Sequence, residues 1–239
     1  MKNIVFIIIL FTNIINSYSQ YYKNYNWEKQ SLLIDSEGNY KNESSVGFFD
    51  NTIIEIVSGK FSNSIIKYVT NHYKIKMLDE FGVSKHSNIL IPMNEVVDFR
   101  DIKVRITDED GEILEFDKKQ MEELHFFEDS PNYKNFQING IKENSTIEVL
   151  YTLEKLYNIH DNKILQKSYP IQSSKFLLIP GPTKAIVKTY GFENIVRDTL
   201  INDSNAKILT LENISPIVDE EYATAIANRK KISYQCSFP

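Results

Sequence analysis

The stretch LQKSYPIQSSKFLLIPGP, Leu165–Pro182, contains an apolar run that is bounded by prolines on both sides. Proline has no backbone N–H for a β-ladder, so Pro170 and Pro180 favour the two ends of a strand. The segment between them, Ile171–Ile179, is therefore predicted to be a single strand. Its second half, Phe176–Ile179, is apolar at every position, which is typical of a strand covered on both faces. We expect a framework strand of a sandwich rather than a ligand-binding loop.

Three other segments, 72–77, 101–107 and 147–154, alternate apolar and polar residues. Successive side chains point to opposite faces of a strand, so each segment is predicted to be a half-buried antiparallel strand. Asp110-Gly111 predicts a tight hairpin between 101–107 and 113–116, because glycine tolerates a positive φ. Phe81-Gly82 is interpreted as another turn. Strand signals without a βαβ rhythm predict an all-β fold, an antiparallel β-sandwich.

Short helices are predicted at two places. Asp117 can cap a helix with Gln120 in the capping-box position, and Met121, Leu124 and Phe127 follow at helical spacing. The acidic segment Asp219–Glu221 is a candidate start for a second, shorter helix. The predicted fold is therefore an antiparallel β-sandwich with one or two short helices.

Residues 1–19 are interpreted as a signal peptide. Lys2 is followed by a short apolar run, and Ser17 and Ser19 are the small residues that signal peptidase reads, which predicts cleavage before Gln20. The run is much shorter than the ~20 residues of a membrane span, so no span is expected after cleavage, although an uncleaved anchor is the alternative. We expect an exported protein, periplasmic or extracellular, with an N-terminal segment at 20–44 and a β-sandwich domain at 45–239.

The composition excludes some functions. The chain carries 27 Lys and Arg against 32 Asp and Glu and has no basic cluster, which argues against nucleic-acid binding. The single cysteine, Cys236, excludes an internal disulfide. It alternates with Ile232 and Tyr234 on the apolar side of a predicted last strand. We therefore interpret Cys236 as a core residue rather than a nucleophile.

No motif predicts a catalytic, cofactor or metal site. The histidines lack metal-ligand spacing and are expected at the surface; they are His72, His86, His125 and His160. Asp108, Asp110 and Gly111 partly match a calcium loop, but Ile106 stands where the first aspartate ligand belongs. The adjacent glutamates at 122–123 and 220–221 cannot face each other on a helix, so they do not predict a carboxylate pair for acid–base catalysis. GxSxG, HExxH and glycine-rich phosphate motifs are missing from the sequence, which argues against hydrolases and nucleotide-binding proteins.

Tyr22, Tyr25 and Trp27 form the one candidate ligand platform. Aromatic faces stack on sugars, and the asparagine amides between them can bond hydroxyl groups. This predicts a binding surface for glycan or peptide of the cell envelope. The alternative is that the segment packs its aromatic side chains on the sandwich.

Five stretches taken in order resemble a known family; they are YKIKMLDEFGVSKHSNILIP, VDFRDIKVRITDEDGEILEF, INGIKENSTIEVLYTLE, YPIQSSKFLLIP and LENISPIVDEEYATAIANRKKISYQCSF. The family is the domain of unknown function that precedes transglutaminase-like domains in exported proteins of Gram-negative bacteria. The resemblance covers residues 45 to 238.

The resemblance implies a non-catalytic β-sandwich followed by a papain-like Cys-His-Asp domain, which is the expected partner in the same polypeptide. Cys236 has no histidine or aspartate after it, so no catalytic residue is carried over from the family. We expect the sequence to be a fragment of a longer protein, and a copy that lost its catalytic half is the alternative.

Overall fold

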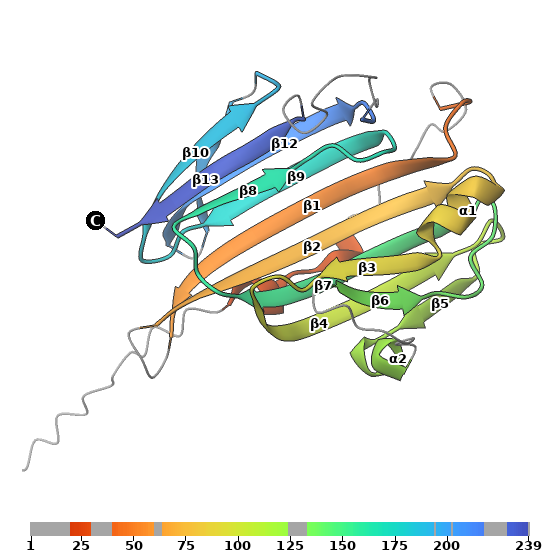
Figure 1. Ribbon diagram of the computed structural model, residues 1–239, viewed down its shortest axis with the longest axis horizontal. Coiled ribbons are helices and arrows are strands. Elements are labelled where there is room, and N and C mark those ends of the chain that lie inside the picture. Colours follow the sequence, from red (N-terminus) through yellow and green to blue (C-terminus); the bar gives the residue numbers. More distant parts are fainter. Residues whose placement is uncertain are drawn as a thin grey trace, which may run out of the picture.

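The computed structural model describes residues 20–29, 40–59, 64–123, 133–193, 195–201, 203–217 and 229–238. The predicted signal peptide, His125 and the helix candidate at Asp219–Glu221 lie outside these residues. Most of the described chain is strand (Figure 1); the strands are β1 (Ser45–Ser58), β2 (Ile65–Met77), β3 (Asn88–Pro92), β4 (Val96–Thr107), β5 (Ile113–Phe116), β6 (Tyr133–Gln137), β7 (Thr146–Lys155), β8 (His160–Ile164), β9 (Ile171–Ile179), β10 (Lys184–Tyr190), β11 (Arg197–Ile201), β12 (Ser204–Ile214) and β13 (Lys231–Ser237).

The strands form one large sheet and two small ones. The large sheet has the order β11-β12-β9-β1-β2-β7-β4-β5, and the small sheets have the orders β10-β13-β8 and β3-β6. Neighbouring strands are antiparallel except β1 and β9, which run parallel. The all-β sandwich is therefore confirmed, with one parallel pair that the sequence pattern did not predict.

Strand β9 confirms the prediction made from its flanking prolines. It runs from Ile171 to Ile179, with Pro170 and Pro180 immediately outside it. It lies between β1 and β12, and Phe176–Ile179 is at most 5% exposed at any position. Both faces of this half-strand are covered, as the continuous apolar run indicates.

Both small sheets cover one face of the large sheet, which we call the inner face. Sheet β10-β13-β8 packs on β1, β9 and β12, where Phe176 and Leu178 meet Ile232 and Tyr234. Sheet β3-β6 packs on β2, β7 and β4 and buries Phe136. The second layer of the sandwich is thus divided into two parts with separate hydrophobic clusters.

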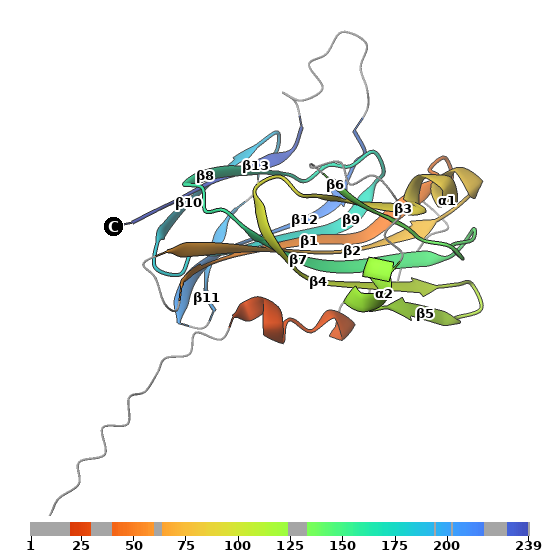
Figure 2. The ribbon, with the colours of Figure 1, turned by 60° about the horizontal axis from the view of Figure 1, so that its bottom comes forward.

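The opposite, outer face of the large sheet carries residues 20–29 (Figure 2). Tyr21 and Tyr25 pack there against a small cluster that includes Ile53 and Leu177. Glu148 and Thr152 of β7 are 4% and 3% exposed, although the alternation predicts that they face solvent. The prediction of a solvated face is wrong at these positions, because a segment distant in sequence covers the middle of the sheet.

Local turn and cap chemistry is largely as predicted. Gly111 has a φ of 84° in the β4–β5 hairpin. Helix α2 (Lys118–Glu123) starts with the predicted capping box, since Gln120 N donates to Asp117 Oδ1 at 2.9 Å and Asp117 N donates to Gln120 Oε1 at 2.9 Å.

The turn predicted at Phe81-Gly82 is wrong, because both residues belong to helix α1 (Glu80–His86). Asp79 caps this helix by accepting from Gly82 N at 2.8 Å. Glycine is needed there for space, since a Cβ would lie 2.0 Å from the carbonyl oxygen of Ser44. Among the described residues, no helix has the length and apolar character to cross a membrane.

Candidate functional site

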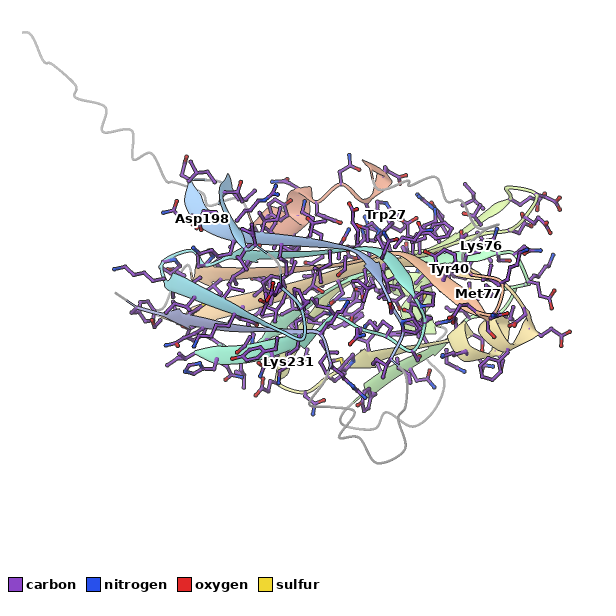
Figure 3. All side chains as sticks on the ribbon, turned by 90° about the horizontal axis from the view of Figure 1, so that it is seen from above. Trp27, Tyr40, Lys76, Met77, Asp198 and Lys231 are labelled. Carbon is purple, nitrogen blue, oxygen red and sulfur yellow. The ribbon has the colours of Figure 1, made fainter. Side chains whose placement is uncertain are left out.

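The predicted aromatic platform lies in a short segment, residues 20–29, on the outer face of the large sheet. Two 3-10 turns build it, η1 (Tyr21–Asn24) and η2 (Trp27–Lys29), and neither is a strand. Figure 3 labels Trp27 on one side of the large sheet and Lys231 of β13 on the other. The platform and the small sheet that contains Cys236 are therefore on opposite sides of the molecule.

His72 links this segment to the sheet. Its Nδ1 lies 2.9 Å from the Tyr25 hydroxyl, and its Nε2 lies 2.8 Å from Glu148 Oε1. The side chain is fully buried, and the ring of Phe49 packs edge-on against it with 4.7 Å between centroids. The surface position predicted for this histidine is wrong, because residues 20–29 cover that part of β2.

The row Tyr25, His72, Glu148 places a hydroxyl, an imidazole and a carboxylate in hydrogen-bonding order. Such a row can activate a nucleophile when the hydroxyl gives up its proton readily. Burial instead raises the pKa of Tyr25 to about 12, so this hydroxyl stays protonated at neutral pH. The arrangement is suited to anchoring the segment rather than to attacking a substrate.

Arg105 of β4 connects Trp27 to the same network. Its guanidinium carbon lies 4.3 Å from the centroid of the Trp27 ring. Its nitrogens lie 2.6 Å from Glu28 Oε1, 2.6 Å from Glu115 Oε1 and 3.7 Å from Glu148 Oε2. A guanidinium over an indole face is an attractive contact, so one face of the single tryptophan is already occupied by protein.

Tyr22 lies apart from the other two aromatic residues. Its ring centroid is 4.7 Å from that of Tyr68, whereas Tyr25 and Trp27 both flank His72. These contacts match the alternative that the segment packs its aromatics on the sandwich. A ligand on the remaining exposed surface of the three side chains stays a prediction.

A second polar group lies on the inner face, and we call it the inner polar seam: Lys67, Asn71, Asp161 and Lys163. Lys67 Nζ lies 3.0 Å from Asp161 Oδ2, and Lys163 Nζ donates to Asn71 Oδ1 at 3.0 Å. These contacts join β8 of the small sheet to β2 of the large sheet. Inward-pointing charges on an edge strand oppose edge-to-edge association, and they hold β8 in one register.

Burial lowers the pKa of Lys163 to about 8, although the charge of Asp50 acts in the opposite direction. Lys167 Nζ lies 3.3 Å from Asp50 Oδ2 and adds like charge nearby. Asp161 and Lys163 are two positions apart on β8 and therefore share a face, which the sequence indicates. The sequence does not indicate that β2 covers this face, because β2 is far from β8 along the chain.

Cys236 is confirmed as a core residue. It lies on β13 with Ile232 and Tyr234, and all three are at most 2% exposed. Burial raises the pKa of the Cys236 thiol to about 11, which disfavours the reactive thiolate. Neither a histidine nor an aspartate side chain forms a hydrogen bond with the thiol among the described residues.

The side chains considered as metal ligands from the sequence have structural roles in the fold. Asp108 Oδ1 accepts from Glu112 N at 2.8 Å and so closes the hairpin that resembles a calcium loop. His86 is half-buried with Nε2 3.0 Å from Ser45 Oγ, and burial lowers the pKa of His86 to about 4. Of the three histidines that the structure describes, only His160 is as exposed as predicted. Across the described residues, no three metal-binding side chains converge.

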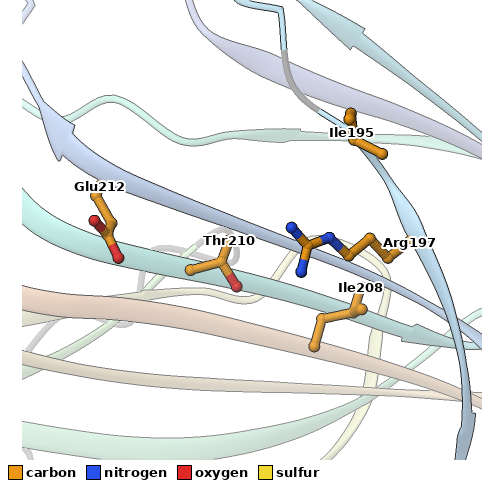
Figure 4. A pocket seen from close by; sticks show the side chains of 5 residues that line it. All are labelled: Ile195, Arg197, Ile208, Thr210 and Glu212. Carbon is orange, nitrogen blue, oxygen red and sulfur yellow. The ribbon is translucent and has the colours of Figure 1, made fainter.

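A shallow pocket of about 460 Å³ lies on the outer face near the β11 edge (Figure 4); its lining residues are Ile195, Arg197, Ile208, Thr210 and Glu212. Figure 4 shows Arg197 extending from β11 toward Thr210 of β12. Neither Arg197 nor Glu212 has an ion-pair partner among the described residues. The pocket therefore offers one cation and one anion to a small polar ligand.

Comparison with known proteins shows the fold and no more. No family model matches the chain, and no curated protein does. The structure is similar to that of a candidate protease from Parabacteroides distasonis, with a TM-score of 0.66 and 13% identity, over 82% of this chain and 41% of that one. It is also weakly similar to an M1 zinc metallopeptidase from Deinococcus radiodurans, with a TM-score of 0.41 and 8% identity, over 81% of this chain and 43% of that one. The chain thus spans about two fifths of the length of the solved structures that it matches.

Proposed function

We propose that this chain is a non-catalytic β-sandwich module of an exported protein, and that it positions or caps a transglutaminase-like catalytic domain C-terminal to it. The observation that carries the proposal is the likeness to the candidate protease, in which the matched region is 41% of the chain. In that protein the sandwich is one part of a longer polypeptide.

The side chains with catalytic potential support a non-catalytic role. The Cys236 thiol is buried on β13, the central strand of the sheet β10-β13-β8, and this burial raises its pKa. His72 and Glu148 are buried under the N-terminal segment and bonded to each other. Each of these groups already has a packing or anchoring task in the sandwich.

The reading frame after the codon for Pro239 tests the proposal. A following segment with cysteine, then histidine, then aspartate is expected. The two-domain chain and the catalytic segment alone would then be compared for thiol-dependent activity and for melting temperature. Lower activity or a lower melting temperature of the segment alone supports the positioning role. A stop codon at that point, in a protein that binds no domain of the envelope, overturns it.

The alternative is a free-standing module that binds glycan or peptide of the cell envelope. Two observations favour it: Trp27 and Tyr25 lie together on the outer face, and Arg197 and Glu212 line a pocket on the same face. Titration with cell-wall muropeptides, followed by Trp27 emission and by calorimetry, tests this role. Binding that is lost in Arg197→Ala supports the alternative, and absence of heat and of any emission change excludes it.

A further inference from the structure

A buried carboxylate without a full set of partners lies at the start of the N-terminal segment. Glu55 of β1 points to the outer face and is 5% exposed. Its Oε1 accepts from Tyr21 N at 2.8 Å, but its Oε2 is buried and has no hydrogen-bond partner among the residues that the structure describes. Gln20 also has a buried side-chain oxygen without a partner, while its Nε2 donates to the Tyr68 hydroxyl at 3.0 Å. Two buried acceptors, Gln20 Oε1 and Glu55 Oε2, therefore lack donors among the described residues at the start of the segment.

No cation within the described part of the chain forms an ion pair with Glu55. Burial raises the pKa of Glu55, and the amides of Tyr21 and Tyr22 and the charge of Lys23 compensate only in part. Arg100 is engaged by Glu154 and Asp98. A buried carboxylate oxygen with no donor is costly, and such an atom in a native fold calls for a ligand that supplies one.

We propose that Glu55 is the binding site of the α-ammonium group that forms when the leader is cleaved before Gln20. Hydrolysis of the Ser19–Gln20 bond adds one water: the acyl side leaves as a carboxylate, and the amide nitrogen of Gln20 becomes a primary ammonium. That nitrogen changes from an amide with one hydrogen to a cation with three. The inference depends on the predicted cleavage position and is independent of the proposed catalytic partner.

The geometry places this cation next to the carboxylate. Standard bond lengths keep consecutive backbone nitrogens within about 3.7 Å of each other, and Tyr21 N already bonds Glu55 Oε1. The ammonium can therefore reach Oε2 with small rotations of Gln20 and Glu55. It can also donate to the unpartnered Gln20 Oε1, which satisfies both buried acceptors.

Processing then strengthens the docking of the whole segment. Residues 20–29 are attached to the sheet by the bond from Tyr21 to Glu55, by Tyr25 on His72 and by Trp27 on Arg105. An added charge-assisted bond at the first residue stabilises the docked state of the cleaved chain only. The uncleaved chain presents an uncharged amide at this position.

The test compares two chains that begin at Gln20, one with a free α-amine and one acetylated at that amine. The free amine is expected to lower the unfolding equilibrium constant about tenfold relative to the acetylated chain at neutral pH. Glu55→Gln should remove this difference, whereas Glu112→Gln, at an exposed hairpin position, should leave it unchanged.

A second readout does not depend on stability. An ammonium bound to a carboxylate has a raised pKa, so Gln20 should react with an amine-specific acylating reagent more slowly than an exposed terminal amine, and Glu55→Gln should restore the faster rate. Equal stability and equal reactivity in the presence and absence of the Glu55 carboxylate overturn the proposal. So does an exported protein that starts at another residue, or one in which Gln20 has lost ammonia by cyclisation.

Discussion

His72 Nε2 on β2 lies 2.8 Å from Glu148 Oε1 on the neighbouring strand β7, and both side chains are buried. The pair is completed by Tyr25, which comes from a segment 47 residues earlier in the sequence and contacts Nδ1 of the same ring. The polar side chains of His72 and Glu148 are stable inside this fold because both nitrogens of the imidazole have hydrogen-bond partners and the aromatic residues of the segment 20–29 cover them. The main task of the network is to attach the N-terminal segment to the sheet.

Replacing Tyr25 by Phe tests this anchor. The substitution leaves His72 Nδ1 without its partner and should lower the free energy of unfolding by about 1–2 kcal/mol. Tyr22→Phe is the matched control, because the Tyr22 hydroxyl has no hydrogen bond among the described residues. Urea unfolding followed by circular dichroism measures both, and equal stability of the two variants would contradict the anchoring role.

Replacing Leu178 by Asp should unfold the domain. Leu178 is fully buried on β9 of the large sheet, on the face that β13 covers, so the substitution places an unpaired charge in the core at a cost of about 3–5 kcal/mol. Leu200→Asp is the control, since Leu200 is 71% exposed on the edge strand β11. Thermal unfolding distinguishes them, and a normal melting temperature for Leu178→Asp would show that β9 is misassigned.

The lowered pKa of Lys163 makes its contribution to the free energy of unfolding increase with pH on the alkaline side. Its folded-state pKa is lowered to about 8, below the ordinary value of 10.5, so between these values the unfolded chain binds more protons than the folded chain. The contribution of Lys163 to the free energy of unfolding should therefore increase through this window, by at most about 1.4 kcal/mol per pH unit for one proton; above pH 9 the raised pKa of Cys236 acts in the opposite direction. Lys163→Met should flatten the slope, and Lys188→Met, at an exposed position, should not.

The thiol of Cys236 should be unreactive in the folded protein. Because it is fully buried with a raised pKa, a disulfide reagent at neutral pH is expected to modify it only at the rate of unfolding. In denaturant the reagent should modify Cys236 completely, and the same mixture without denaturant is the control. Rapid stoichiometric labelling of the native protein would instead place the thiol at an accessible surface.

Part of the candidate site was predictable from the sequence and part was not. Tyr25 and Trp27 stand out because aromatic residues cluster near the predicted mature N-terminus, and the structure brings both to His72. The burial of His72 does not follow from its sequence context, because alternation along β2 indicates which residues share a face but not what covers that face. The burial of Asp161 and Lys163 is not predictable from the sequence for the same reason.

Elements whose causes are local follow from the amino-acid sequence alone. Prolines define the ends of β9, a glycine with positive φ closes the β4–β5 hairpin, and Asp117 with Gln120 starts α2. These features depend on backbone geometry and on hydrogen bonds between residues a few positions apart.

The way in which the elements cover one another is apparent only in the folded protein. The parallel pairing of β1 with β9, the burial of His72 and the contact of Lys67 with Asp161 all join residues far apart in the chain; the last pair is separated by 94 positions. Strand periodicity is identical whether a face meets solvent or another segment. The burial of a polar side chain therefore depends on a covering partner that the local pattern does not specify.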